Sequence, residues 1–148
     1  NLGIGEKSEK KKFYITNRRD SSSFLKVEHR IKGNKDYQIE EEREINIKSL
    51  DEIFNQKILL EPILMKIDVQ GFELEVLKGS SNILRKIKYI IIEVSNSEIY
   101  SKQPLSNEII EYLNLKNFQV FKKNSITTKI PKSNFIQVDI LFKNKLIN

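Results

Sequence analysis

The segment ILMKIDVQGFELEVLKG, residues 63–79, decides the fold because it joins an apolar run to an acidic corner and then to a helical pattern. The run Ile63–Ile67 follows Pro62 and is short, apolar and bounded, which is typical of a strand buried on both faces. Asp68 comes immediately after this run. The sequence therefore predicts a carboxylate at the end of a buried strand.

A tight turn and a helix should follow that strand. Gly71 lets the backbone turn sharply and approach a ligand closely. Residues 72–78 carry leucines three positions apart, and Gly79 is placed to cap the helix C-terminus. A second helical turn and another apolar run, KYIIIEV at 88–94, come next. Two such strands separated by helix predict a βαβ unit with parallel strands and a right-handed crossover.

Shorter signals upstream predict two strands and one helix. KKFYIT at 11–16 is typical of a strand, and YQIEEEREINI at 37–47 is typical of a charged edge strand. Between them, FLKVEHRIKG at 24–33 is compatible with a further strand or with a loop. A Ser-x-x-Glu capping box at 49–52 predicts a short helix over Leu50–Phe54.

Downstream, the sequence predicts one more helix and two strands. Residues 104–117 repeat apolar positions at helical spacing, with Ser106 as the expected N-cap. FQVF at 118–121 and NFIQVDILFKN at 134–144 are typical of strands. Because the linker between them is polar and has no helical pattern, these two strands should pair antiparallel.

Together these elements predict one α/β domain over residues 1–148. Its sheet would contain three parallel strands with helices between them, closed by one antiparallel strand. This arrangement is the second half of a doubly wound sheet, and a first half would be needed to cover the far face of Ile63–Ile67. The length suits one hydrophobic core.

The composition is that of an ordinary globular domain and argues against several classes of function. The formal net charge is +6, but acidic and basic residues are interspersed, and no aromatic residues alternate with a basic stripe. We therefore expect lysines on solvated faces rather than a surface for nucleic acid or acidic lipid. No apolar run approaches the roughly 18 residues of a membrane span. Cysteine is absent, which excludes disulfides and thiolate metal sites and fits a cytoplasmic location.

Three carboxylates are the candidates for chemistry. Ligands of open α/β sheets bind outside the carboxyl ends of the strands, where Asp68 lies, with Glu93 near the end of the neighbouring strand. Glu73 falls in the first helical turn, where the positive end of the helix dipole favours its charge. Each also has a structural interpretation: an Asx-turn or helix cap for Asp68, helix-terminus stabilisation for Glu73, and neutralisation by Lys66 for Glu93.

The same residues resemble a known family. LMKIDVQGFELEVLKGSSNIL at 64–84, IIIEVS at 90–95 and Tyr100 look like the FkbM-type methyltransferases. The Lys-Ile-Asp-x-x-Gly-x-Glu pattern with its Leu-x-Gly ending is seldom met by chance. The resemblance covers nearly the whole chain, because four more segments follow in the family's order: NLGIGEKSEKKKFYI at 1–15, SSSFL at 21–25, SLDEIF at 49–54 and QVDILFKN at 137–144.

The resemblance implies a Rossmann-like, class I fold that uses S-adenosylmethionine to methylate an oxygen of a small-molecule or glycan acceptor, such as a sugar, a lipid or a secondary metabolite. It implies that the corner formed by Asp68, Gln70 and Gly71 faces the acceptor and the methionine end of the cofactor. It also implies that Asn1 and Gly3 lie beside the adenine. These five residues are the expected cofactor-binding set.

Asp68, Glu73 and Glu93 are the expected catalytic set. Methyl transfer from a sulfonium is an in-line displacement, so the enzyme must align the acceptor hydroxyl with the methyl group and often removes a proton. Asp68 would orient the acceptor hydroxyl or accept its proton, and the two glutamates would shape the site. No metal is expected, although oxygen ligands at Asp68, Glu93 and Asn96 leave a magnesium-dependent variant open.

The sequence departs from the family pattern at its start. The family begins with a strand, a glycine-rich turn that wraps the cofactor and an acidic residue on the second strand. Here the sequence GIG at 3–5 follows no strand and leads into a charged segment. We therefore expect the chain to be the C-terminal part of a methyltransferase, starting near the end of its third strand. By itself it should neither hold the cofactor tightly nor turn over.

Other interpretations stay open. A truncated or degenerate module that binds a partner without catalysis would explain the missing cofactor half. A different Rossmann-like enzyme, such as one that modifies nucleotide sugars, would explain the parallel strands but not the Asp-x-x-Gly-x-Glu corner. His29 is expected in a surface or loop-packing role rather than as a base. Tyr100 either touches the substrate from the loop after the fifth strand or packs in the core.

Overall fold

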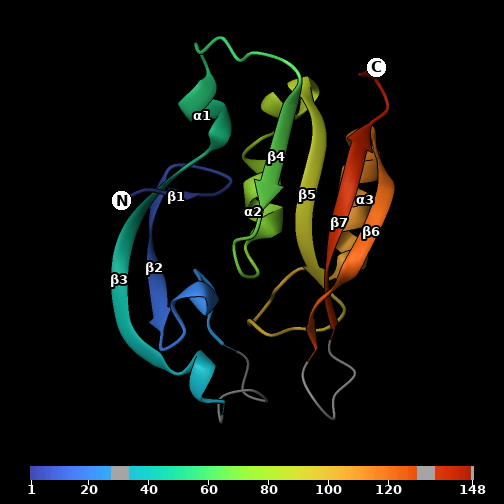
Figure 1. The fold of residues 1–148 in the computed structure, drawn as a ribbon. Helices are drawn as coiled ribbons and strands as arrows, with labels where there is room; N and C mark the ends of the chain where they lie inside the picture. The colour runs from blue at the N-terminus through green and yellow to red at the C-terminus, as the bar shows by residue number, and fades with distance from the viewer. Residues whose placement is uncertain (28–33, 130–135, 148) are drawn as a thin grey trace.

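The computed structural model describes residues 1–27, 34–129 and 136–147. These residues form a mixed α/β fold with a three-stranded sheet, in the order β1-β3-β2, and a four-stranded sheet, in the order β4-β5-β7-β6. Figure 1 shows the two sheets side by side, with helices α2 and α3 behind the four-stranded sheet. The strands of the three-stranded sheet are β1 (Gly3–Ile4), β2 (Glu9–Thr16) and β3 (Ile39–Lys48).

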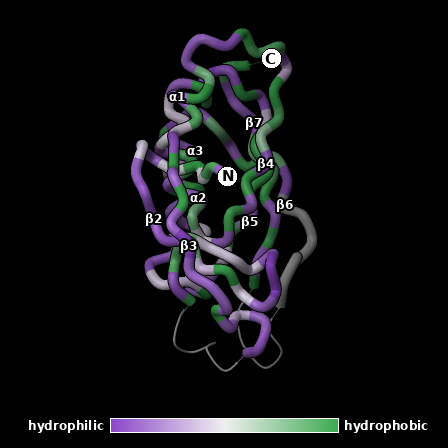
Figure 2. Tube along the Cα trace, turned by 90° about the vertical axis from the view of Figure 1, so that its left-hand side faces the viewer, coloured by the Kyte–Doolittle hydropathy of each residue, from purple (hydrophilic) through white to green (hydrophobic). Residues whose placement is uncertain are grey.

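The three-stranded sheet consists mainly of the antiparallel pair β2 and β3. The predicted charged strand at 37–47 is confirmed in β3, most of which is exposed, but β3 is the central strand of its sheet rather than an edge strand. Its second edge is covered by β1 over Gly3–Ile4 only, so the rest of this edge stays open in the described residues. Figure 2 shows mostly hydrophilic residues along β2 and β3. The pairing of β1 with β3 was not foreseen, because a two-residue strand leaves no periodic signal in the sequence.

The four-stranded sheet contains the predicted βαβ unit. β4 and β5 are parallel, and β7 is antiparallel to both β5 and β6. β7 therefore lies between two strands that run in the same direction, whereas it was expected to close the sheet at its edge. Ile140 and Phe142 of β7 are fully buried, and a central position gives them apolar neighbours on both sides. The strands are β4 (Ile63–Ile67), β5 (Ile87–Ser95), β6 (Phe118–Lys129) and β7 (Ile136–Asn144).

The sequence predicted that β4 is buried on both faces, and this prediction is wrong. Ile67 is buried, but Leu64 is 58% exposed. In the described residues β4 is an edge strand paired only with β5. On one face Ile63, Met65 and Ile67 pack in or against the hydrophobic core. On the other face Leu64 and Lys66 are exposed. Apolar composition alone cannot distinguish such a strand from a central one.

In the residues that the structure describes, three α-helices of different length connect the strands. α1 (Leu50–Phe54) begins with the predicted capping box, in which Ser49 and Glu52 each accept a backbone N–H of the other at 3.1 and 3.0 Å. α2 (Glu73–Lys78) follows β4, and α3 (Ser106–Leu115) precedes β6. No helix in the part of the chain that the structure describes has the length and hydrophobicity to cross a membrane.

One predicted helix cap is wrong and another is confirmed. The N-cap of α3 is Leu105 rather than Ser106, and the Glu108 carboxylate accepts the Leu105 N–H at 3.0 Å. Gly79 is the C-cap of α2, as predicted, with a φ of −72°. The requirement for glycine at this cap is steric, because a Cβ would overlap the carbonyl oxygen of Gly5. The C-terminus of α2 thus packs directly against the backbone beside β1.

Candidate functional site

The turn after β4 has an unusual backbone. Gln70 and Gly71 both have positive φ, 53° and 94°, so the chain reverses sharply between the strand and α2. The Ser23 hydroxyl donates to the carbonyl oxygen of Gln70 at 2.6 Å. A Cβ on Gly71 would lie 3.0 Å from Cδ2 of Tyr100. Gly71 is therefore required both for its conformation and for the close approach of the Tyr100 ring.

Asp68 lies at the end of β4 and is held by two side chains. Its carboxylate accepts from Nε2 of Gln70 at 2.9 Å and from Nζ of Lys66 at 3.2 Å. The ion pair and hydrogen bond raise the pKa of Lys66. The N-cap of α2 is Phe72, so the interpretation of Asp68 as the helix cap is wrong. Lys66, considered as a partner for Glu93, makes its ion pair with Asp68.

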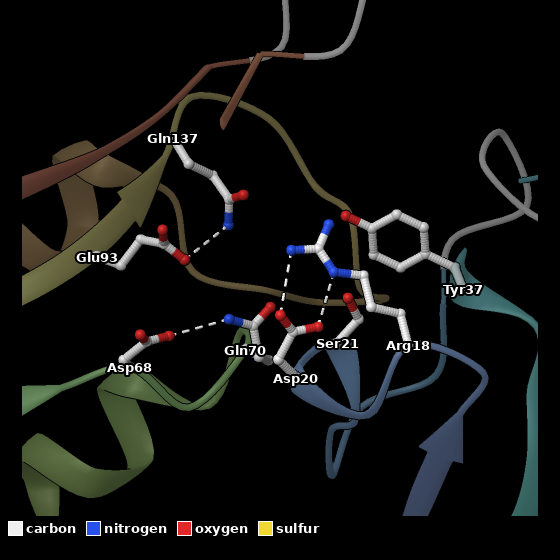
Figure 3. A pocket seen from close by; sticks show the side chains of 8 residues that line it. All are labelled: Arg18, Asp20, Ser21, Tyr37, Asp68, Gln70, Glu93 and Gln137. Carbon is white, nitrogen blue, oxygen red and sulfur yellow. Dashed lines mark hydrogen bonds and ion pairs between the residues drawn. The ribbon is translucent and has the colours of Figure 1, made fainter. Parts of the chain in front are cut away.

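Asp68 and Glu93 line one pocket of about 370 Å³, as Figure 3 shows. The parallel pairing of β4 and β5 brings their carboxyl ends to the same edge of the sheet. Glu93 accepts a hydrogen bond from Nε2 of Gln137 on β7 at 3.1 Å. Four side chains of the large sheet and its turn thus form one wall: Asp68, Gln70, Glu93 and Gln137.

The other wall comes from the N-terminal region, and sequence reasoning missed it. It consists of Arg18, Asp20, Ser21 and Tyr37. The Arg18 guanidinium pairs with the Asp20 carboxylate at 2.8 and 3.1 Å, which raises the pKa of Arg18, and burial raises the pKa of Tyr37. Arg18 and Asp20 follow the carboxyl end of β2, which points to the same end of the molecule as β4 in Figure 1. Because the packing of one sheet beside the other is long-range, no local signal in the polar segment NRRDSSS marked it as a pocket wall.

Glu73 lies behind the turn rather than in the pocket. Its side chain is 4% exposed and accepts the Gly71 N–H at 3.0 Å. Burial raises the pKa of Glu73 to about 7, although hydrogen bonds from backbone N–H groups act in the opposite direction. The position fits a residue that holds the turn, whereas its predicted catalytic role stays a prediction.

Tyr100 is fully buried but is connected to the pocket by hydrogen bonds. Its hydroxyl donates to the carbonyl oxygen of Ser21 at 2.8 Å and lies 3.0 Å from Oε1 of Gln70. Both of these residues line the pocket. Burial raises the pKa of Tyr100 far above its ordinary value. Tyr100 is therefore neither exposed to a substrate nor only a packing residue.

The remaining candidates lie elsewhere. Asn1 is exposed, and Gly3 pairs in register with Ile47 of β3, so their expected contact with adenine stays a prediction. The amide oxygen of Asn96 accepts the Ile136 N–H at 2.8 Å, and no group of three or more His, Cys, Asp or Glu residues within the described ranges is placed to hold a metal. His29 lies outside the described residues.

A second hollow, of about 310 Å³, adjoins the start of α2. Gly71 and Phe72 line it together with Lys11 and Lys102. The Lys11 ammonium lies 5.2 Å from the centre of the Phe72 ring. The turn 68–72 therefore has a hollow beside each end: one is rich in carboxylates, and the other is lined by two lysines and two glutamates.

Comparison with known proteins identifies the family of the chain. The sequence model of the Methyltransferase FkbM domain matches residues 1–120, which include β4, the turn, α2 and β5. The chain belongs to the FkbM methyltransferase domain family. The hexuronic acid methyltransferase AglP of Haloferax volcanii is 28% identical to this FkbM domain over 104 residues. That match covers 64% of the chain and 44% of AglP, so the FkbM domain spans less than half of this relative. No solved structure matches the chain.

Proposed function

We propose that this FkbM domain is part of an S-adenosylmethionine-dependent O-methyltransferase, whose acceptor hydroxyl binds in the pocket at the carboxyl ends of β4 and β5. The observation that carries the proposal is the meeting of Asp68 and Glu93 in that pocket. The sheet order β4-β5-β7-β6, with an antiparallel β7 between parallel-running neighbours, supports a Rossmann-like class I fold. Family membership supports the reaction class.

The residues of the pocket suit the methionine end of the cofactor and a hydroxyl acceptor. Asp68 and Glu93 supply carboxylate oxygens for a sulfonium, an ammonium or a hydroxyl group. When bound, S-adenosylmethionine supplies an electrophilic methyl group. In our proposal Asp68 orients the acceptor hydroxyl and takes its proton as the oxygen becomes nucleophilic. Gln70 and Lys66 each occupy one direction on the carboxylate, which leaves lone pairs for the hydroxyl.

The acceptor that we propose is a sugar hydroxyl. The pocket is lined with polar side chains, including Arg18, Asp20, Ser21 and Gln137, which can each bond to a hydroxyl group. Tyr37 adds an aromatic ring at the same wall. AglP, a relative over part of its length, is named as a methyltransferase of hexuronic acid. This resemblance supports a carbohydrate acceptor and leaves the individual sugar to experiment.

The direct test uses the full-length protein with S-adenosylmethionine labelled in its methyl group. Phenyl glycosides of glucose, galactose and glucuronic acid serve as acceptors, and label transferred to the glycoside is measured. Asp68→Asn should lower kcat by about 10²–10⁴-fold, while calorimetry should still detect binding of S-adenosylhomocysteine. Asp51→Asn is the matched control, because Asp51 accepts backbone N–H groups of Asn82 and Ile83 and lines no part of the pocket.

Three outcomes distinguish the interpretations. Full turnover by Asp68→Asn would end the role of Asp68 as the base. A full-length protein that neither methylates any of these glycosides nor binds S-adenosylhomocysteine would support the non-catalytic module instead. Calorimetry on residues 1–148 alone tests the separate expectation that this segment binds the cofactor only weakly.

A further inference from the structure

Tyr100 packs between two segments that are distant from it in sequence, residues 26–27 and the turn at Gly71. Its backbone forms an antiparallel bridge with Val27, and the Ser101 N–H donates to the Lys26 carbonyl oxygen at 2.7 Å. Its ring fills the space that the missing side chain of Gly71 leaves. The side chain is 0% exposed. Such a ring is held in one position, so its hydroxyl is a fixed hydrogen-bonding group.

The hydroxyl of Tyr100 determines how the Gln70 amide is oriented. An ionised Asp68 can only accept hydrogen bonds, so the Gln70 NH₂ group must face Asp68, at 2.9 Å. The amide oxygen of Gln70 must then face the Tyr100 hydroxyl, at 3.0 Å. The hydroxyl shares its hydrogen between this oxygen and the Ser21 carbonyl at 2.8 Å. A chain of hydrogen bonds thus runs from the core through Tyr100 and Gln70 to Asp68.

We propose that Tyr100 is a positioning residue that orients the Asp68 carboxylate through the Gln70 side chain. This inference rests on the proposed function, since it concerns the same carboxylate. Because Tyr100 is fully buried, it cannot touch an acceptor in the pocket. Its action is to hold the Gln70 amide, and with it one oxygen of Asp68, in the geometry that an in-line transfer requires. It also ties the Ser21 wall of the pocket to the turn.

Tyr100→Phe tests the hydroxyl while it keeps the ring. In the full-length protein, with whichever of the three phenyl glycosides is methylated, kcat should fall about tenfold, and the KM for S-adenosylmethionine should stay unchanged. Tyr112→Phe is the matched control, because the Tyr112 hydroxyl donates to the Leu77 carbonyl at 3.3 Å and Tyr112 does not line the pocket. Its kcat should equal that of the natural protein.

A double-mutant cycle separates positioning from packing. Gln70→Met keeps the length of the side chain and removes both hydrogen bonds, so it should reproduce the loss in kcat. In the Gln70→Met background, Tyr100→Phe should have no further effect. A Tyr100→Phe loss of the same factor in both backgrounds, or no loss in either, overturns the proposal. If Tyr100→Phe does not fold, a Gln70→Met variant with full kcat overturns it equally.

A readout without turnover distinguishes this proposal from the proposed function. In ¹⁵N-labelled full-length protein, the side-chain amide resonances of Gln70 are assigned by their loss in Gln70→Met. Tyr100→Phe should shift them, and Tyr112→Phe should not. If the protein methylates nothing but the resonances shift, the proposed function fails and the hydrogen-bonded chain stands. Resonances that do not move in Tyr100→Phe contradict the proposal whatever the activity.

Discussion

The four-stranded sheet is held by side chains that water does not reach, whereas most of β3 in the three-stranded sheet is exposed. Ile90, Ile92 and Phe142 of the large sheet are 0% exposed and belong to the main hydrophobic cluster. Exposed residues of the small sheet instead form ion pairs, such as Lys12 with Glu42 and Arg43 with Glu41.

This difference separates two tasks in one site. The large sheet fixes Asp68 and Glu93 at the ends of parallel strands, where a well-packed core limits their movement. The small sheet and its adjoining turns supply Arg18 and Tyr37 from a region with few large buried residues. We infer that the carboxylates of Asp68 and Glu93 are held rigidly and that the opposite wall of the pocket moves away at a lower free energy.

The largest expected effect comes from a matched pair of Ile→Ala substitutions. Ile90→Ala in β5 should cost about 4 kcal/mol, because Ile90 is 0% exposed inside the main cluster. Ile15→Ala in β2 should cost about 2 kcal/mol, because Ile15 is 8% exposed and belongs to neither hydrophobic cluster. Denaturant unfolding of both variants measures the difference. Equal costs, or a larger cost at Ile15, would remove the contrast between the sheets.

The next effect concerns pH and the carboxyl behind the turn. The pKa of Glu73 is about 7 in the folded chain, against an ordinary value of 4.5. Between these values the folded chain keeps a proton that the unfolded chain has released, so stability falls as pH rises through this window and is lower above it. The loss should be on the order of 3 kcal/mol.

Glu73→Gln should remove that pH dependence, because its amide keeps an acceptor for the Gly71 N–H and does not ionise. The measurement is Tm of both proteins between pH 4.5 and 8, with Glu75→Gln as a control whose carboxylate pairs with Lys78 on the surface of the same helix. Parallel curves of Tm against pH for the natural protein and Glu73→Gln would show that burial does not raise the pKa of Glu73.

A smaller effect is expected where the two regions meet. Gly79→Ala would place a methyl group against the Gly5 carbonyl oxygen, so the backbone must shift to accept it. Overpacking of this kind should cost about 1–3 kcal/mol, measured by thermal unfolding. The comparison is Ser81→Ala, which removes the hydrogen bond from a half-buried hydroxyl to the Lys78 carbonyl oxygen at 2.9 Å and adds no group beside Gly5. An unchanged free energy of unfolding in Gly79→Ala would show that the backbone at Gly5 shifts without measurable cost.

The smallest effect is expected at an exposed ion pair within β3. In the natural protein the hydrogen bond and ion pair with Arg43 lower the pKa of Glu41. Glu41→Gln removes this ion pair. Both side chains are about half exposed, and pairs in that setting contribute little. Tm at 0.15 M salt should therefore not change measurably. A clear loss of Tm would show that exposed ion pairs within β3 contribute more to stability than pairs in that setting usually do.

The parts of the fold that local patterns encode could be predicted from the sequence. The Ser49 capping box, the βαβ unit and the placing of Asp68 and Glu93 at one edge depend on short spacings or on the rule for parallel strands. The position of β7 and the second sheet depend on contacts between distant segments, which no short pattern specifies. For the same reason Arg18 and Tyr37 were missed as members of the pocket.

Glycines illustrate the limit at the level of single residues. Gly71 was expected to turn the chain, and its φ of 94° confirms this. Gly79 was expected to cap α2 and does so, but glycine is needed there because a side chain would overlap the Gly5 carbonyl oxygen. A glycine in a sequence thus indicates that a side chain is not tolerated, but the reason becomes visible only in the packing.

The central claim is that methyl transfer takes place in the pocket between Asp68 and Glu93. A crystal structure of the full-length protein with S-adenosylhomocysteine tests it most directly. The account predicts that the sulfur atom faces the pocket lined by Asp68, Gln70 and Glu93. A ligand whose sulfur lies instead in the hollow lined by Lys11, Phe72 and Lys102 would contradict it.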